Sequence, residues 1–200
     1  LETAATLERL AEAFNGVLLI DEAYVDFVDP ALGYDATSLV QRHDNVLILR
    51  TLSKGYSLAG LRFAYGIGAI ELLEPMLYKT RDSYNTDLIS QRLATAALQG
   101  RSQASGGWQS VREERVAMAT ALSELGLECL PGQANFLLAT VPAQAPLTAA
   151  GLYEWLKKNG ILVRYFDQDG LRDRLRITIG TAEQNRRLLD CIREGLNRAG

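Results

Sequence analysis

One lysine stands where covalent chemistry could occur, in a short polar loop that follows an apolar run. Lys54 lies between Ser53 and Gly55, shortly after the apolar residues 46–49. A lysine that is partly desolvated and close to other cations has a lowered pKa, and it becomes a nucleophile or a Schiff-base former. We therefore predict that Lys54 acts as a nucleophile or forms a Schiff base. The alternative is an ordinary solvated lysine.

Four further residues carry groups that complement this lysine: Asp21, Thr51, Ser53 and Arg62. Asp21 ends the apolar run 17–20, so its carboxylate needs a donor, and the N–H of a pyridinium ring would serve. The two hydroxyls and the forked guanidinium suit a phosphate dianion, through charge-assisted hydrogen bonds. The alternatives are that Asp21 ties a loop and that Arg62 forms a surface ion pair.

Short apolar runs indicate the strands that position these residues. The runs at 17–20 and 46–49 are too short for helices and are typical of strands buried on both faces, and residues 62–67 are a third candidate. Helix patterns occupy residues 5–14 and 86–99. Strands that alternate with helices predict an α/β fold with a largely parallel sheet, in which ligands bind at the carboxyl ends of the strands.

The second half of the chain has a pattern of its own, which predicts a small α+β domain. A long helix is expected at 108–125, with Trp108 and the later Trp155 as core residues. Strands are predicted at 136–139, 161–166 and 175–179, and helices at 148–158 and 182–197. We place the domain boundary inside the long helix, with residues 1–115 in the first domain and 116–200 in the second.

Composition excludes several classes of protein. With 48% apolar and 22% charged residues, the chain is neither disordered nor collagen-like. A net charge of −3 gives no electrostatic reason for binding nucleic acid, and no apolar run approaches the ~20 residues that span a bilayer. One histidine, His43, lies in a polar stretch and is expected to be solvated, so no metal site is predicted. With two cysteines and no signal peptide, we expect reduced thiols and a cytoplasmic location.

The segments Asp21–Tyr24 (DEAY) and Arg50–Arg62 (RTLSKGYSLAGLR) resemble the core signature of the pyridoxal-phosphate aminotransferases of fold type I, in particular the histidinol-phosphate aminotransferases. Residues 134–136 (ANF) and 175–181 (LRITIGT) match this family too. The resemblance covers essentially the whole chain, and it identifies the superfamily more specifically than the substrate. It implies that the first domain is the remainder of a large cofactor-binding domain.

The resemblance also implies a role for each motif residue. Lys54 would hold pyridoxal 5′-phosphate through a Schiff base and then move a proton between substrate and cofactor. Asp21 would hold the pyridinium nitrogen, and Tyr24 would hydrogen-bond the phenolic oxygen of the cofactor. Its phosphate would be bound by Ser53, Arg62 and Thr51.

Three residues of the second domain are implied in substrate binding. Arg176 would pair with a substrate carboxylate, or with the phosphate of an amino alcohol phosphate. Arg164, on the preceding strand, would bind the substrate phosphate, or else it is structural. Asn135 would contact the substrate, or else it ties a turn.

The implied reaction moves an amino group between glutamate or 2-oxoglutarate and histidinol phosphate or imidazole acetol phosphate, in histidine biosynthesis, by a homodimer. One alternative is another aminotransferase of this fold or an amino-acid-phosphate decarboxylase, since the cofactor motifs are shared. The other alternative is a non-catalytic fragment. The chain begins at Leu1 rather than methionine, so we expect a processed product or a piece of a longer chain. The glycine/serine phosphate loop and the ring-stacking aromatic of this family have no counterpart in the sequence.

Overall fold

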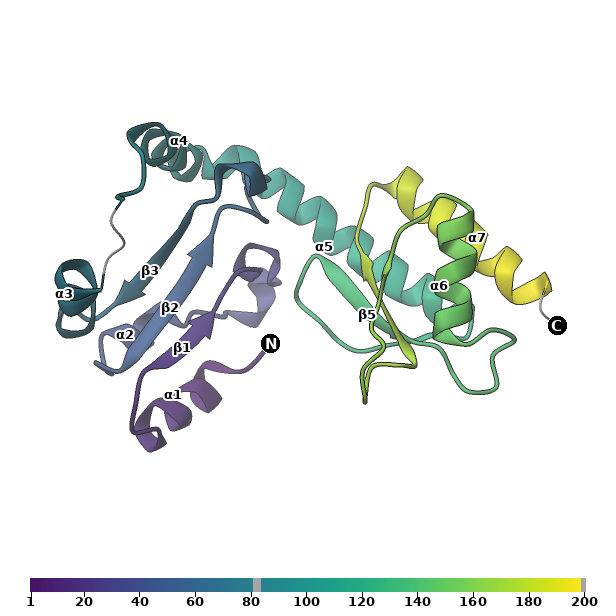
Figure 1. The fold of residues 1–200 in the computed structure, drawn as a ribbon, viewed down its shortest axis with the longest axis horizontal. Helices are drawn as coiled ribbons and strands as arrows, with labels where there is room; N and C mark the ends of the chain where they lie inside the picture. Colours follow the sequence, from purple (N-terminus) through teal and green to yellow (C-terminus); the bar gives the residue numbers. More distant parts are fainter. Residues whose placement is uncertain (81–83, 199–200) are drawn as a thin grey trace. The chain divides into compact units, whose positions relative to one another are not determined.

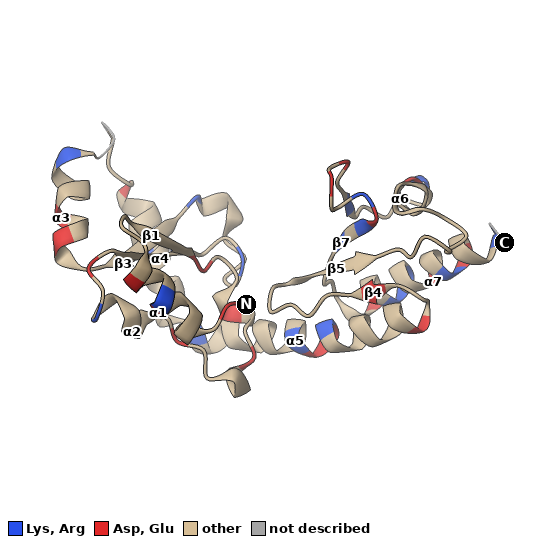
Figure 2. Cartoon of the chain, turned by 90° about the horizontal axis from the view of Figure 1, so that it is seen from below, with Lys and Arg blue, Asp and Glu red and all other residues tan. Residues whose placement is uncertain are grey.

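The computed structural model describes residues 1–80 and 84–198 (Figure 1). They divide into two compact units, and the division falls between Trp108 and Gln109. Basic and acidic residues are interspersed along both units (Figure 2). Each unit has a sheet and a hydrophobic core of its own.

The first unit is built on a mixed sheet of three strands, β1 (Leu18–Asp21), β2 (Val46–Thr51) and β3 (Ala64–Gly68), in the order β1-β2-β3 (Figure 1). Strands β1 and β2 are parallel, with Asp21 opposite Leu49. Strand β3 runs antiparallel to β2, with Ala64 opposite Thr51.

The prediction of a largely parallel sheet is therefore wrong for β3, although the α/β class is confirmed. A parallel return to the same sheet needs a crossover connection, which is usually a helix. The residues between β2 and β3 contain only a single 3₁₀ turn, η3 (Ala59–Leu61). The chain consequently returns beside β2 in the opposite direction, and this short return contains Lys54.

Helices α1 (Ala4–Ala13) and α2 (Thr37–Val40) cover one face of this sheet. The hydroxyl of Thr3 caps α1, because it accepts the N–H of Thr6 at 3.1 Å. The core between helices and sheet is formed by Leu7, Ala11, Ile20, Ala36, Leu39, Val46 and Ile48. The 3₁₀ turns η1 (Val25–Phe27) and η2 (Pro30–Leu32) connect β1 to α2.

Two more helices follow β3 in the first unit, α3 (Ile70–Lys79) and α4 (Leu88–Gln99). The prediction of a helix at 86–99 is confirmed by α4, which Asp87 caps by accepting the N–H of Ser90 at 2.8 Å. Helix α3 was not predicted, because Pro75 inside it lacks a backbone donor and is typical of a helix break. Helix α5 (Arg101–Glu124) contributes residues to both units.

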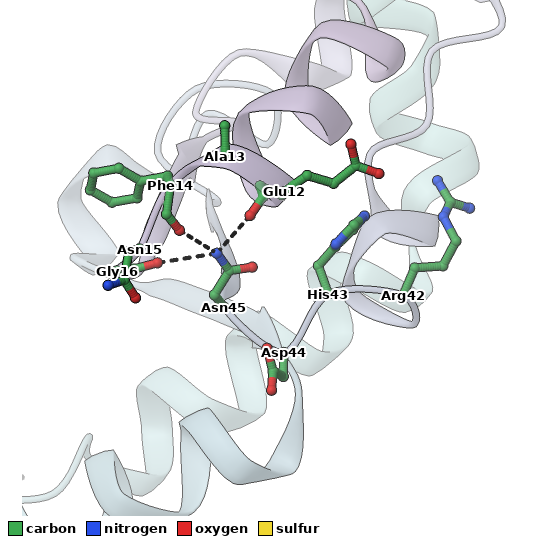
Figure 3. Close-up of a pocket in the computed structure, with 10 residues that line it drawn as sticks. Glu12, Ala13, Phe14, Asn15, Gly16, Arg42, His43, Asp44 and Asn45 are labelled. Atoms are coloured by element: carbon green, nitrogen blue, oxygen red, sulfur yellow. Dashed lines mark hydrogen bonds between the residues drawn. The ribbon is translucent and has the colours of Figure 1, made fainter.

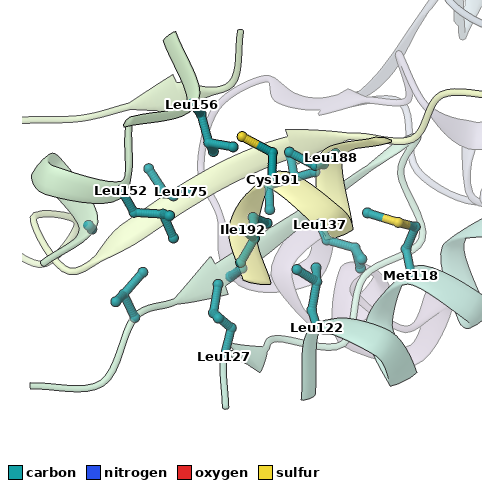
Figure 4. Close-up of a cluster of buried hydrophobic side chains, with 14 of the residues drawn as sticks. Met118, Leu122, Leu127, Leu137, Leu152, Leu156, Leu175, Leu188, Cys191 and Ile192 are labelled. Atoms are coloured by element: carbon teal, nitrogen blue, oxygen red, sulfur yellow. The ribbon is translucent and has the colours of Figure 1, made fainter. Parts of the chain in front are cut away.

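The second unit is an antiparallel sheet of four strands in the order β4-β5-β7-β6. The strands are β4 (Glu128–Cys129), β5 (Phe136–Thr140), β6 (Arg164–Tyr165) and β7 (Arg174–Thr178). Side chains from α5, α6 (Ala149–Lys158) and α7 (Ala182–Arg198) pack on one face (Figure 4). The most completely buried members of this core include Leu122, Leu152, Leu175, Ile177 and Ile192.

Candidate active site

Two strands of the first unit end at the same edge of the sheet, and their last residues carry polar groups. Asp21 is the final residue of β1, is exposed, and accepts the N–H of Ala23 at 2.9 Å. This bond ties the loop after β1, which is the alternative role given to Asp21 in the sequence analysis. Among the described residues, its carboxylate has no other hydrogen-bond partner. The other carboxylate oxygen is therefore available to an N–H donor of a ligand.

The loop between β2 and β3 is held by its own backbone. The N–H of Leu58 donates to the carbonyl of Leu52 at 3.1 Å, and the N–H of Ser57 donates to the carbonyl of Lys54 at 3.1 Å. Leu52 is fully buried and anchors the loop. The Lys54 side chain is exposed, and its Nζ lies 5.8 Å from the ring centroid of Tyr24. The structure thus brings this lysine and this tyrosine together.

The two hydroxyls beside Lys54 contact each other. Thr51 Oγ1 lies 2.9 Å from Ser53 Oγ and 3.0 Å from the carbonyl oxygen of Phe63. It also accepts the backbone N–H of Ser53 at 3.1 Å. Thr51 therefore closes the start of the loop, and the Ser53 hydroxyl is the less committed of the two.

Two residues of this loop have left-handed backbone conformations without being glycine. Ser57 has φ 57° and Arg62 has φ 55°. Such conformations are uncommon for non-glycine residues and cluster at functional sites. The Arg62 side chain is exposed and donates from Nη1 to the carbonyl of Ala59 at 3.0 Å. That bond leaves further N–H groups of the guanidinium for an anion.

A buried ion pair joins the ends of β1 and β2, and the sequence analysis missed it. Glu22 accepts the Nε–H of Arg50 at 2.7 Å, with side-chain exposures of 3% and 23%. Burial, together with the Glu22 charge, raises the pKa of the neighbouring Tyr34 phenol. The sequence signal for this pair was that Glu22 directly follows β1 and Arg50 lies near the end of β2. The two residues lie 28 positions apart, so their pairing could not be read locally.

In the second unit, Arg164 and Arg176 face each other across the β6–β7 pair. Their guanidinium carbons lie 5.4 and 5.9 Å from the ring centroid of Phe166, and that of Arg176 also lies 5.3 Å from the ring of Phe136. Within the described parts of the chain neither arginine has a carboxylate partner, and Nε of Arg176 is buried without a hydrogen bond. Like charges directly opposite each other repel, so this arrangement favours a bound anion.

Asn135 lies just before β5, where its carbonyl accepts the N–H of Ile179 at 2.9 Å. Its backbone thus extends the β5–β7 pairing. The preceding residues are held by Arg115 of α5, which is 6% exposed. This arginine donates to the carbonyl of Ala134 and to Gln133 Oε1, both at 2.9 Å. The sequence analysis missed Arg115, because a single arginine in an amphipathic helix is usually solvated.

A cavity of about 380 Å³ lies at the opposite end of β1 and β2 from Lys54 (Figure 3). There the Asn45 side-chain amide donates to the carbonyls of Ala11, Phe14 and Gly16 at 3.0 to 3.2 Å. The prediction of a solvated His43 is wrong, since its side chain is 15% exposed beside Glu8. The Asn45 bonds tie the end of α1 to the start of β2. The cavity itself lies away from the strand ends that carry Asp21 and Lys54.

Across residues 1–80 and 84–198, no three metal-ligating side chains of His, Cys, Asp or Glu gather in a group. None of the helices in these ranges is long and apolar enough to cross a membrane. The predicted cofactor residues all lie in the first unit and the predicted substrate residues all lie in the second.

Residues 1–192 match the family model described as aminotransferase class I and II. This chain belongs to the class I and II aminotransferases. It is 48% identical over 188 residues to histidinol-phosphate aminotransferase 1 of Nostoc sp., an alignment that covers 94% of this chain and 51% of that protein. The chain spans about half the length of the curated relatives it matches.

Solved structures show the same fold. Histidinol-phosphate aminotransferase from Sinorhizobium meliloti, in complex with pyridoxal-5′-phosphate, superposes with a TM-score of 0.87 at 22% identity, over 100% of this chain and 54% of that one. L-threonine-O-3-phosphate decarboxylase from Porphyromonas gingivalis gives a TM-score of 0.82 at 20% identity, over 98% of this chain and 60% of that one. Likeness at these identities describes the fold and leaves the reaction open.

Proposed function

We propose that this class I and II aminotransferase chain carries the cofactor lysine of a pyridoxal-phosphate-dependent enzyme that transfers an amino group between histidinol phosphate and 2-oxoglutarate. The observation that carries the proposal is Lys54, an exposed amine beside Tyr24 at the strand ends, in a chain of this family. The 48% identity to a histidinol-phosphate aminotransferase supports the choice of substrate.

The groups at this edge fit pyridoxal phosphate. Among the described residues, the Lys54 amine has no hydrogen-bond or ion-pair partner. Asp21 offers a carboxylate to a ring N–H, and Ser53 and Arg62 offer donors to a phosphate dianion. When bound, pyridoxal phosphate supplies an aldehyde and a ring that withdraws electrons.

Each residue then has a defined role. Lys54 holds the cofactor and moves a proton at the α-carbon of the substrate. Asp21 would accept the N–H of the ring nitrogen, and Tyr24 would orient the ring through its hydroxyl. The cofactor phosphate is bound by Ser53 and Arg62, with Thr51 shaping the loop beneath it.

The paired arginines of the second unit fit the anions of both substrates. Arg164 and Arg176 stand opposite each other around Phe166, and the repulsion between them is relieved when an anion binds. We assign Arg176 to the glutamate carboxylate and Arg164 to the phosphate of histidinol phosphate. Asn135, at the entry to β5, completes this set.

The wider assembly belongs to the same proposal. We infer a fold type I arrangement, in which residues 1–115 are the remainder of the large domain and 116–200 form a small domain. The division into two compact units supports it. Membership of the aminotransferase family supports a homodimer acting on small molecules in the cytoplasm. Light scattering of the active protein measures the dimer.

Reductive labelling tests the role of Lys54. The chain is treated with pyridoxal phosphate and then borohydride, which turns a lysine that has bound the aldehyde into a stable secondary amine. Peptide mapping is expected to find the label on Lys54 in excess over Lys79 and Lys157. Lys54→Arg should abolish this excess, and Lys79→Arg should leave it intact. Equal labelling of all lysines contradicts the assignment and favours the non-catalytic fragment.

A second experiment tests the reaction. The N-terminal half of the Nostoc relative is joined ahead of Leu1, and histidinol phosphate is supplied with 2-oxoglutarate. We expect formation of glutamate that depends on Lys54. The decarboxylase neighbour makes the alternative specific, because release of CO₂ from an amino acid phosphate would favour it over transamination. A folded, labelled but inactive protein would contradict the proposed reaction.

A further inference from the structure

The residue that follows Lys54 accepts a hydrogen bond from a tryptophan in a distant part of the chain. The indole N–H of Trp108, in α5, donates to the carbonyl of Gly55 at 2.6 Å. Trp108 is 5% exposed, so water competes weakly for this bond. The sequence analysis predicted only a core role for Trp108. The structure adds a polar contact one residue from the cofactor lysine.

Two neighbours fix the orientation of this indole. Tyr56 packs edge-on against it, with ring centroids 5.4 Å apart and an interplanar angle of 78°. The guanidinium of Arg101 lies 5.4 Å from the indole ring. Aromatic and cation–π contacts of this kind favour one ring position. The indole N–H is therefore held toward the loop.

The space beside the Cα of Gly55 is filled by Asp26 of η1. A Cβ atom on Gly55 would contact the Asp26 carboxylate, with Cγ at 2.6 Å and Cβ at 2.7 Å. Only glycine permits so close an approach. Gly55 is thus confined between the Asp26 side chain and the hydrogen bond from Trp108. The Lys54 carbonyl is itself held by the N–H of Ser57 at 3.1 Å.

We propose that Trp108 is a positioning residue for Lys54, and that its indole N–H and the Asp26 side chain together fix Gly55, the residue next to the lysine in the chain. This inference rests on the proposed function of Lys54. A lysine side chain has four rotatable bonds and loses much entropy on ordering. A fixed backbone confines its amine to a smaller volume and raises the fraction of time it spends at the cofactor aldehyde.

The test compares two tryptophans that make the same kind of bond. Trp155 donates its indole N–H to the carbonyl of Cys191 at 2.9 Å, in the second unit. Phenylalanine keeps an aromatic ring at either position, and in both variants it removes the donor together with the same part of the ring volume. Trp108→Phe is expected to lower the ratio of pyridoxyl label on Lys54 to label on Lys79 about fivefold, the factor for one hydrogen bond. Trp155→Phe should leave the ratio unchanged.

A second pair of variants guards against misfolding of Trp108→Phe. Gly55→Ala places a methyl group against Asp26, whereas Gly60→Ala in the same loop meets nothing within 4 Å. We expect the first to lower the labelling ratio and the second to retain it. A wild-type ratio in folded Trp108→Phe, or an equal fall in Trp155→Phe, overturns the proposal.

Competitive acetylation without cofactor separates this inference from the proposed function. Acetic anhydride reacts with each lysine at a rate set by its exposure and pKa, and a pH series gives both for Lys54 and Lys79. A change confined to Lys54 in Trp108→Phe supports positioning even if pyridoxal phosphate does not label the chain. An unchanged Lys54 profile overturns it, whatever the outcome for the cofactor.

Discussion

Replacing Glu22 by alanine removes the negative partner of a guanidinium behind the strand ends. The Glu22 side chain is 3% exposed and accepts Arg50 Nε–H at 2.7 Å, and Arg50 is 23% exposed. The variant leaves Arg50 charged, partly desolvated and without this carboxylate. Because Glu22 follows Asp21 directly and Arg50 precedes the Lys54 loop, the loss also loosens the edge that carries the proposed cofactor site.

The magnitude follows from the burial of the two partners. Removing one partner of a fully buried ion pair costs about 3–5 kcal/mol of folding free energy. Arg50 keeps some contact with water, so we expect the lower end of this range, about 3 kcal/mol. The matched control is Glu8→Ala, which breaks the Glu8–Arg42 pair. That pair has a similar length of 2.9 Å but exposures of 36% and 49%, so its loss should cost below about 1 kcal/mol.

Urea unfolding followed by tryptophan fluorescence measures these costs. The chain has two tryptophans, so Trp155→Phe leaves Trp108 as a reporter of the first unit. The double variant Glu22→Ala/Arg50→Ala should cost less than the sum of the two single variants, because it leaves no unpaired charge. A cost for Glu22→Ala no larger than that for Glu8→Ala would refute the reasoning.

Three further predictions follow from single contacts. Burial raises the pKa of the Asp26 carboxyl, against the attraction of Arg101 and Arg50 and together with repulsion from Glu22. The stability contributed by protonated Asp26 is therefore complete below the ordinary pKa of 3.8 and is lost as the pH rises through the raised pKa. Asp26→Asn should therefore make the free energy of unfolding depend less on pH between acidic and neutral conditions. Arg164→Gln should stabilise the second unit by about 0.2–1 kcal/mol in buffer without phosphate, and it should reduce the rise in melting temperature that added phosphate gives the wild type. Asn45→Ala should cost about 1–2 kcal/mol in urea unfolding, because one carbonyl in the last turn of α1 and two after it lose their side-chain donor. A cost near zero would assign those carbonyls to water.

Local patterns predicted the parts of the fold that depend on local sequence. The runs at 17–20 and 46–49 form strands β1 and β2, and the polar residues that end them lie at one sheet edge. Likewise α4, α6 and α7 lie at the predicted helical segments, because capping and apolar periodicity are encoded within each segment. The prediction that both faces are buried is wrong for β1, because Leu19 is 54% exposed.

The features that escaped prediction depend on pairing between distant residues. The direction of β3 is set by the length and content of the connection, and the apolar run itself is compatible with either direction. Trp108 and Gly55 lie 53 positions apart in the sequence. A tryptophan in the core gives the same sequence pattern whether or not its indole N–H donates a hydrogen bond. Arg115 is similar, because its carbonyl partner at Ala134 is brought to it only by the folded second unit.

The left-handed residues of the lysine loop have a consequence for the design of variants. Glycine adopts the conformation of Ser57 and Arg62 without steric cost, so Ser57→Gly is expected to stabilise the folded loop. Arg62→Gly would relieve the same strain but remove the guanidinium. A thermostability screen at this loop will therefore favour replacements at Arg62 that raise the melting temperature and remove an anion-binding side chain. Thermal stability and cofactor binding are therefore opposed at Arg62. A screen for stable variants should select for melting temperature and for cofactor binding at the same time.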